Sequence, residues 1–258
     1  MKKTSIQTIL TDTMTVFWGE WLDLRVRILP IAAAGLTSPL IYILAFGFGL
    51  GSSMPKPAIG GNYLEFMLPG MVALSSMTVS FTGTVFSICG ERLYSKTFEE
   101  LLLLPVHPLA LHAGKMLAGI LRGVLTSVSV ILVAVLFTQK LVFLHPLFLL
   151  LIILNSAVFS AMGVIVGLTV KSLESVGLYN NFIITPMSFL GATFFDPASL
   201  PVALKGIVYL LPLTYASIGL RAAAYDMAKF PWYSIPVLLV AAIAFSLIGG
   251  RQFSTQQD

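Results

Sequence analysis

Long runs of apolar residues without a charge most constrain how this chain can fold. One such run extends from about Leu144 to Val170, and an α-helix needs about 20 residues to cross a hydrocarbon core about 30 Å thick. Of the 258 residues, 57% are hydrophobic and 10% are charged, whereas soluble domains have about 25% charged residues. The pattern predicts an all-α integral membrane protein. At about 40 residues for each span with its connection, the length allows about six crossings.

The apolar runs predict where these six membrane-spanning helices lie. They fall near residues 28–50, 64–88, 111–137, 144–170, 176–195 and 232–250. The stretch from Leu200 to Leu213 is apolar, but it is too short to cross and prolines bound it. This stretch predicts an external re-entrant hairpin before the last helix. Residues 28–258 thus form a single predicted transmembrane domain.

Lysine and arginine positions predict the orientation of the spans. With six crossings both termini lie on one side, and ten of the 15 basic residues lie on that side, against five on the other. The asymmetry predicts that both termini are cytoplasmic. Lys96 then faces the cytoplasm, while Lys56, Lys140 and Lys205 face outward.

Residues 1–27 predict a cytoplasmic interfacial helix. Apolar residues recur there at three- and four-residue steps, while Asp12, Glu20 and Asp23 fall on another face. The apolar set is Ile6, Leu10, Met14, Phe17, Trp21 and Leu24. Such a helix lies in the headgroup layer or, equally well, packs on the cytoplasmic end of the bundle.

A second charged helix is predicted over Glu91–Leu104, between the second and third spans. One side carries Tyr94, Phe98, Leu101, Leu102 and Pro105, and the other carries Arg92, Lys96, Glu99 and Glu100. A short charged helix at the cytoplasmic surface is what a partner protein would contact. The four charged residues are therefore the candidates for coupling to a partner.

The sequence lacks the motifs by which a membrane protein would power transport or catalysis itself. No GxxxxGK[ST] phosphate loop is present, because Leu109 and Met116 occupy its first and last positions around Gly114 and Lys115. The acidic residues near the spans fall at predicted span ends, so no mid-membrane carboxylate indicates ion-driven transport. The histidines lack metal-ligand spacing and adjoin no GxSxG turn. We therefore expect no catalytic site, metal site or nucleic-acid partner.

The charged helix and the segments around it resemble the type-2 ATP-binding-cassette permeases. From Gly90 to Val106 an acidic pair precedes LLLLPV, which is similar to the coupling loop of that family. Other stretches resemble its second span, third span, fifth span and approach to the last span: Leu68–Met71, Ala118–Gly123, Thr185–Gly191 and Leu211–Tyr215 with Arg221. Leu211 departs from the asparagine that many relatives carry.

The resemblance implies a permease subunit of an ATP-driven exporter, nearest to the small exporters of drugs and of nodulation-type lipo-oligosaccharides. It implies a homodimer in a bacterial inner membrane, with two separate nucleotide-binding subunits that hold ATP and Mg²⁺. The substrate would be an amphipathic or lipid-linked molecule, such as a lipid, glycolipid, saccharide or drug. The alternative is a self-contained channel or a membrane-embedded transferase.

Polar residues within the spans are the candidates for a substrate path. Arg122 lies about two turns, or about 10 Å, past Lys115. It either snorkels to the cytoplasmic headgroups or binds an anionic headgroup or a partner carboxylate. The fifth span carries a polar cluster: Tyr179, Asn180, Asn181, Thr185 and Ser188. Hydrogen bonds between helices of one subunit explain this cluster as well as a substrate path does.

Two GxxxG steps indicate close helix packing. Gly119 with Gly123 lies on the third span, and Gly163 with Gly167 lies on the fourth. Such steps serve packing within a subunit more often than a dimer seam.

Overall fold

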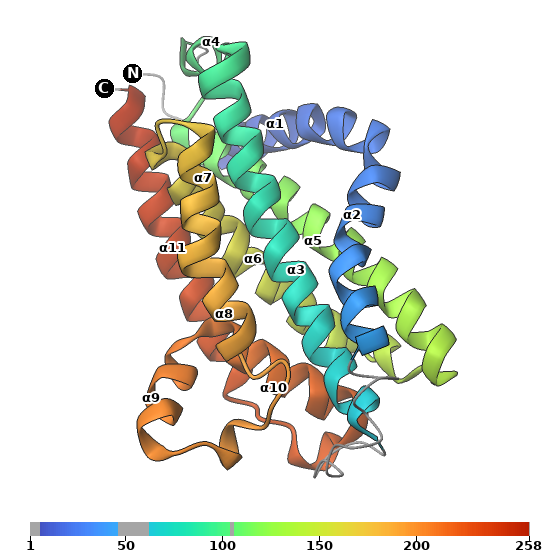
Figure 1. Ribbon diagram of the computed structural model, residues 1–258. Helices are drawn as coiled ribbons and strands as arrows, with labels where there is room; N and C mark the ends of the chain where they lie inside the picture. The colour runs from blue at the N-terminus through green and yellow to red at the C-terminus, as the bar shows by residue number, and fades with distance from the viewer. Residues whose placement is uncertain (1–5, 46–61, 104–105, 258) are drawn as a thin grey trace.

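The computed structural model describes residues 6–45, 62–103 and 106–257, which form helices and no strand. The long helices run side by side as a bundle, and shorter helices lie at its two ends (Figure 1). They are α1 (Ile6–Val26), α2 (Ile28–Tyr42), α3 (Tyr63–Gly90), α4 (Thr97–Leu103), α5 (Pro108–Thr138), α6 (Pro146–Thr169), α7 (Leu173–Tyr179), α8 (Thr185–Leu190), α9 (Val202–Leu210), α10 (Pro212–Tyr225) and α11 (Ser234–Gln257).

Five helices of the described chain are long and apolar enough to cross a membrane. They are Ile28–Ala45, Tyr63–Ser95, Pro108–Thr138, Pro146–Thr169 and Ser234–Thr255. Each matches one predicted span to within a few residues, except that residues 46–50 of the first span lie outside the described residues. The fifth predicted span, 176–195, corresponds to a helical run over Leu173–Leu190 in which a π-helical turn, Asn180–Ile184, joins α7 to α8. This run is about 27 Å long.

Prolines and histidines set where two of the crossing helices begin. α5 begins at Pro108 and α6 at Pro146, a first-turn position where the missing N–H costs no hydrogen bond. The Nδ1 atoms of His107 and His145 accept hydrogen bonds from the backbone N–H groups two residues on, at 3.2 and 3.3 Å. These two histidines therefore act as helix caps.

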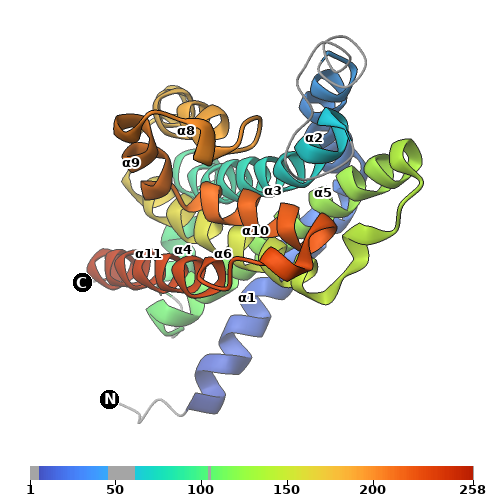
Figure 2. The ribbon, with the colours of Figure 1, turned by 90° about the horizontal axis from the view of Figure 1, so that it is seen from below.

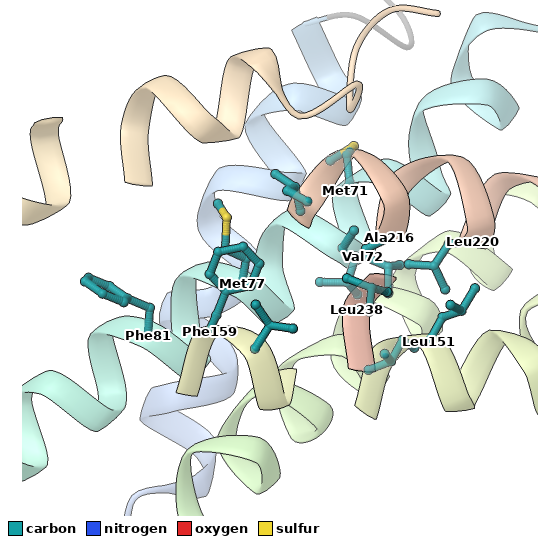
Figure 3. Close-up of a cluster of buried hydrophobic side chains, with 14 of the residues drawn as sticks. Met71, Val72, Met77, Phe81, Leu151, Phe159, Ala216, Leu220 and Leu238 are labelled. Atoms are coloured by element: carbon teal, nitrogen blue, oxygen red, sulfur yellow. The ribbon is translucent and has the colours of Figure 1, made fainter. Parts of the chain in front are cut away.

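The core lies where α3 and α6 pack against each other and against α5, α10 and α11. Figure 3 shows side chains of this buried cluster, among them Val72 of α3, Leu151 of α6 and Leu220 of α10. An apolar lining alone does not hold helices together in lipid, because lipid is equally apolar. Close packing of small residues supplies the contact area instead.

The two GxxxG steps form this close packing inside one subunit. A Cβ added at Gly119 would collide with the side chains of Thr84 and Ser160, and one added at Gly163 would lie 2.8 Å from the carbonyl oxygen of Phe81. The glycines therefore bring α3, α5 and α6 together and are not available as a seam between two copies.

A bent pair of helices closes the end of the bundle opposite the termini. α9 and α10 meet at an angle of 92°. In the view from below, α10 lies on the viewer's side of α3 and α6 and packs against both (Figure 2). Arg221 anchors this hairpin. Its guanidinium donates to the carbonyl oxygens of Phe66 and Ala192 at 2.9 and 2.8 Å and lies 3.7 Å from the ring centroid of Phe66. The hairpin thus extends well beyond the predicted Leu200–Leu213.

The single charged helix predicted over Glu91–Leu104 is wrong. The helix α3 continues through a π-helical turn to Ser95, and the chain then breaks at Lys96, whose φ is 55°. The separate helix α4 starts at Thr97. Tyr94, before the break, is 70% exposed, whereas Phe98, after the break, is buried. Leu104 and Pro105 lie outside the described residues.

One charged residue of the N-terminal helix lies elsewhere than its predicted polar face suggests. α1 lies across one end of the bundle and packs against α5 (Figure 1). Leu10 and Met14 of the apolar set are 59% and 60% exposed on the protein, which suits contact with lipid, whereas Glu20 is buried beside Leu24. A charge interaction described below outweighs the apolar pattern here.

The arrangement makes the predicted orientation testable. Both termini lie at the end that carries α1 and α4, and α9 lies at the other end (Figure 1). In a Cys89→Ala background, we expect a cysteine at position 96 to resist a membrane-impermeant maleimide in intact spheroplasts and a cysteine at position 205 to react. Labelling at 96 without permeabilisation would contradict the orientation.

Candidate functional site

A cavity of about 1150 Å³ lies between α1, α2, α3 and α5. One part of its wall is apolar and includes Ile31 of α2 with Leu74, Val79 and Phe86 of α3. At the end covered by α1 the wall becomes charged, with Glu20, Glu91, Lys115 and Arg122 together. The cavity is therefore amphipathic along its length.

Glu20 is the centre of the charged end. The Lys115 ammonium donates hydrogen bonds to Oε1 of Glu20 and to Oε1 of Glu91. The Nη2 atom of Arg122 donates to Oε2 of Glu20 at 2.6 Å, and the Ser87 hydroxyl donates to Glu20 Oε1 at 2.8 Å. One carboxylate from α1 thus joins two cations of α5 and a hydroxyl of α3.

The surroundings of Glu20 keep it ionised. Burial alone raises the pKa of a carboxyl group, but the charges of Lys115 and Arg122 and the hydrogen bonds from Lys115 and Ser87 outweigh burial and lower the pKa of Glu20 from 4.5 to about 2. A lowered pKa stabilises the fold above the unfolded value of 4.5, and this contribution is lost as the pH falls towards 2. The ion pairs therefore persist throughout the neutral range.

Arg122 is fixed on both sides of its guanidinium. While Nη2 binds Glu20, Nη1 donates to the carbonyl oxygen of Gly83 at 2.8 Å. Arg122 is 6% exposed, so its guanidinium is enclosed by protein groups. Of the two interpretations that the sequence left open, the geometry matches binding to a carboxylate.

The cavity wall formed by α2 is lightly packed. Only 11% of the span Ile28–Ala45 is buried, against 67% of the α3 and α6 spans. α2 packs against α5 at Gly35, where an added Cβ would collide with the Thr126 side chain. Any side chain larger than glycine at position 35 would therefore clash with α5.

The structure separates the other predicted path residues. Asn180 lines the cavity together with Arg122. Tyr179 and Ser188 are half-buried, and the Ser188 hydroxyl donates back to the Thr185 carbonyl oxygen. Asn181 and Thr185 are exposed on another face of the α7–α8 run. The five residues thus do not form one surface.

The four predicted coupling residues also differ in position. Lys96, Glu99 and Glu100 are exposed. Arg92 instead turns inward, where Nη1 donates to the carbonyl oxygens of Gly167 and Val170 at 2.9 and 3.2 Å. It ties the end of α3 to the end of α6, and its guanidinium lies 5.8 Å from the ring centroid of Phe98 in α4.

Sequence reasoning missed Glu20, Lys115 and Glu91 as members of this site. The available signal was on α5, where Lys115 and Arg122 are seven residues apart and so lie on one helix face. Two cations on the buried face of a membrane helix require a carboxylate from a neighbouring segment. In the described part of the chain no group of three or more His, Cys, Asp or Glu residues could hold a metal ion.

Comparison with known proteins identifies the family. The model of the ABC-2 type transporter family matches residues 11–225, which include most of α1, the lining of the cavity, α4 and the α9–α10 hairpin. The chain belongs to the ABC-2 type transporter family. It is 28% identical over 244 residues to the inner membrane transport permease YadH of Escherichia coli K12, covering 91% of this chain and 94% of that protein.

Nodulation proteins are also similar to this permease. Nodulation protein J of Rhizobium leguminosarum bv. viciae is 27% identical over 205 residues, with 79% of this chain and 78% of that protein covered. Nodulation protein J of Rhizobium meliloti 1021 is 29% identical over 183 residues, with 70% and 69% covered. The similarity extends over the spans of one membrane domain.

The Glu20 ion pairs predict a large effect of neutralising this carboxylate. Glu20→Gln removes the negative charge that pairs with the buried Arg122 and Lys115. We therefore expect the free energy of unfolding in detergent to fall by about 3–5 kcal/mol. Asp23→Asn on the same helix, which removes an exposed pair with Arg27, should cost about 1 kcal/mol or less. Arg122→Gln added to Glu20→Gln should restore part of the loss. Equal effects of the two single substitutions would contradict a structural role for Glu20.

Proposed function

We propose that this permease is the transmembrane subunit of an exporter that moves an amphipathic or lipid-linked molecule across the bacterial inner membrane. The class of substrate comprises lipids, glycolipids, saccharides and drugs. The observation that carries the proposal is the cavity, whose apolar wall suits an acyl chain or ring system and whose charged end suits a polar head. The name of the E. coli relative supports the location.

Energy would come from ATP hydrolysis on two copies of a separate nucleotide-binding subunit that holds ATP and Mg²⁺. This chain has no phosphate loop, so the permease itself would perform no catalysis. The helix α4 offers the contact, because it stands at the end of the bundle (Figure 1) and exposes Glu99 and Glu100. Through Lys96 and the π-helical turn before it, α4 connects directly to α3, which lines the cavity.

Reversing the exposed charges of α4 tests this docking site. Glu99→Lys with Glu100→Lys leaves the bundle intact, because both side chains are solvated, but places like charges against the partner surface. We expect co-purification of the nucleotide-binding subunit encoded beside the permease to fall about tenfold or more. Lys205→Glu, a charge reversal at the opposite end, is the control and should change nothing. Undiminished assembly of the α4 variant would overturn the site.

The exposed polar face of the α7–α8 run supports a homodimer. Asn181 lies near the middle of the Leu173–Leu190 run and is exposed, as is Thr185 one turn further. A side-chain amide at the membrane centre is costly against lipid and is better placed against another protein surface. We therefore propose that this face meets a second copy of the chain or the path between the two copies.

Cysteine cross-linking tests this arrangement. In the Cys89→Ala background, Asn181→Cys should form a disulfide-linked dimer in native membranes on mild oxidation, because the two copies would bring this face together. Leu132→Cys, at an exposed apolar position of α5 that would face lipid, should remain monomeric on a non-reducing gel. A dimer band from Leu132→Cys alone would place the interface on α5 instead.

A further inference from the structure

The charged end of the cavity has an acidic excess. Among the residues that the structure describes, four carboxylates line the cavity and three basic side chains oppose them. The acidic set is Asp12, Glu20, Asp23 and Glu91, and the basic set is Arg27, Lys115 and Arg122. The lining therefore carries one net negative charge. A cleft with apolar walls concentrates the field of such an excess on whatever enters it.

The basic side chains of the lining are all bound to protein groups. Arg27 pairs with Asp23 at 3.2 Å. Lys115 binds Glu20 and Glu91, and Arg122 binds Glu20 and the backbone of Gly83. An anionic head group would have to displace the buried Glu20 carboxylate from Lys115 or Arg122, whereas Arg27 with Asp23 is an exposed pair. This arrangement argues against the anionic head group that Arg122 suggested in the sequence, and it makes Arg122 a positioning residue for Glu20.

Two of the carboxylates retain binding capacity. Within the described ranges no cation pairs with Asp12, which is half-exposed on α1. Glu91 uses Oε1 for Lys115, but its Oε2 has no hydrogen-bond partner, and 23% of its side chain is exposed. Glu91 therefore offers an acceptor and part of a negative charge at the cavity wall.

Unpaired oxygens recur on other residues of the same wall. Ser75 Oγ, Thr82 Oγ1 and Asn180 Oδ1 are buried without a hydrogen-bond partner, and Ser75 is only 2% exposed. A buried oxygen without a donor costs free energy that a bound donor would recover. Asn180 Oδ1 accepts hydrogen bonds, the hydroxyls of Ser75 and Thr82 accept or donate them, and the two buried cations of the lining, Lys115 and Arg122, are already bound to Glu20.

We propose that the cavity selects amphiphiles whose head group is positively charged and donates hydrogen bonds, the chemistry of an alkylammonium. The head group would contact Glu91, Asp12 would add to the attractive field, and the chain would lie along Phe86, Val79 and Leu74, the part of the wall in which the other unpaired oxygens lie. The inference rests on the proposed function in taking this cavity as the substrate path. The test measures binding to the permease without a nucleotide-binding subunit. Its result therefore does not depend on whether the proposed docking or export occurs.

Competition among probes of one chain length tests the selectivity. The full chain is placed in phosphatidylcholine nanodiscs, and specific binding of radiolabelled dodecylammonium is measured against empty nanodiscs. Unlabelled dodecylammonium should displace the label at a concentration at least about tenfold lower than dodecanol or dodecyl phosphate, because only the ammonium forms charge-assisted hydrogen bonds with Glu91. Dodecyl phosphate displacing the label equally well or better would overturn the proposal.

Substitutions locate the selectivity within the cavity. Glu91→Gln should weaken dodecylammonium binding about tenfold. Asp12→Asn, which breaks no ion pair and should leave the fold unchanged, should weaken it about threefold through the lost field. Glu65→Gln, which removes a carboxylate near Lys140 at the other end of the bundle, is the matched control and should bind as the parent does. Unchanged binding in both cavity variants, or an equal loss in Glu65→Gln, would overturn the role of the lining charge.

Discussion

The contact between Glu20 and the two cations of α5 determines how the rest of the bundle can be arranged. Lys115 and Arg122 both lie within a membrane-crossing helix and are buried, a placement that costs several kcal/mol for each charge without a partner. The carboxylate that compensates them comes from α1, outside the spans. α1 is therefore held against α5 by charge, and it leaves Leu10 and Met14 exposed to the surroundings of the protein.

Around this contact the molecule divides into a tightly packed part and a lightly packed wall. α3, α5 and α6 approach closely because glycines and hydroxyl side chains face one another, as at Gly123, where an added Cβ would collide with Ser80. α2 has few buried residues and contacts α5 near Gly35. The cavity lies between these two parts. A cavity in this position can change its shape without breaking the packed core, which suits a transport path.

Hydropathy predicted five of the six spans, because a bilayer imposes a minimum length on every apolar helix. The predicted span 176–195 corresponds instead to a shorter helical run with a π-helical turn in it. The inward-facing residues of α1 could not be predicted in the same way. The pattern of Ile6, Leu10 and Met14 does not show whether apolar residues face lipid or protein, because in a membrane apolar residues can face outward while a carboxylate faces inward to pair with buried cations. Periodicity also could not show the break at Lys96, since a lysine in the left-handed region carries no sequence signature comparable to glycine.

The site itself was only partly predictable for a related reason. Arg122 was identified because a charge inside a span is rare, whereas Glu20 and Glu91 lie at segment ends where charges are ordinary. Their importance arises from three-dimensional proximity between α1, α3 and α5. The polar residues of the fifth span were similarly divided between the cavity and an outer face by helix rotation, which the π-helical turn at Asn180–Ile184 alters.

The contact at Gly35 has a mechanical consequence. α2 crosses α5 (Figure 1) and packs against it at Gly35 and Thr126, where no added bulk fits, so a tilt of α2 against α5 would have this contact as its fulcrum. The helix extends about 15 Å from Gly35 to Ala45, so a tilt of about 20° about the fulcrum would move that end by about 5 Å. The opposite end, which joins α1, would swing the other way. A tilt of α2 would thus widen one end of the cavity and narrow the other.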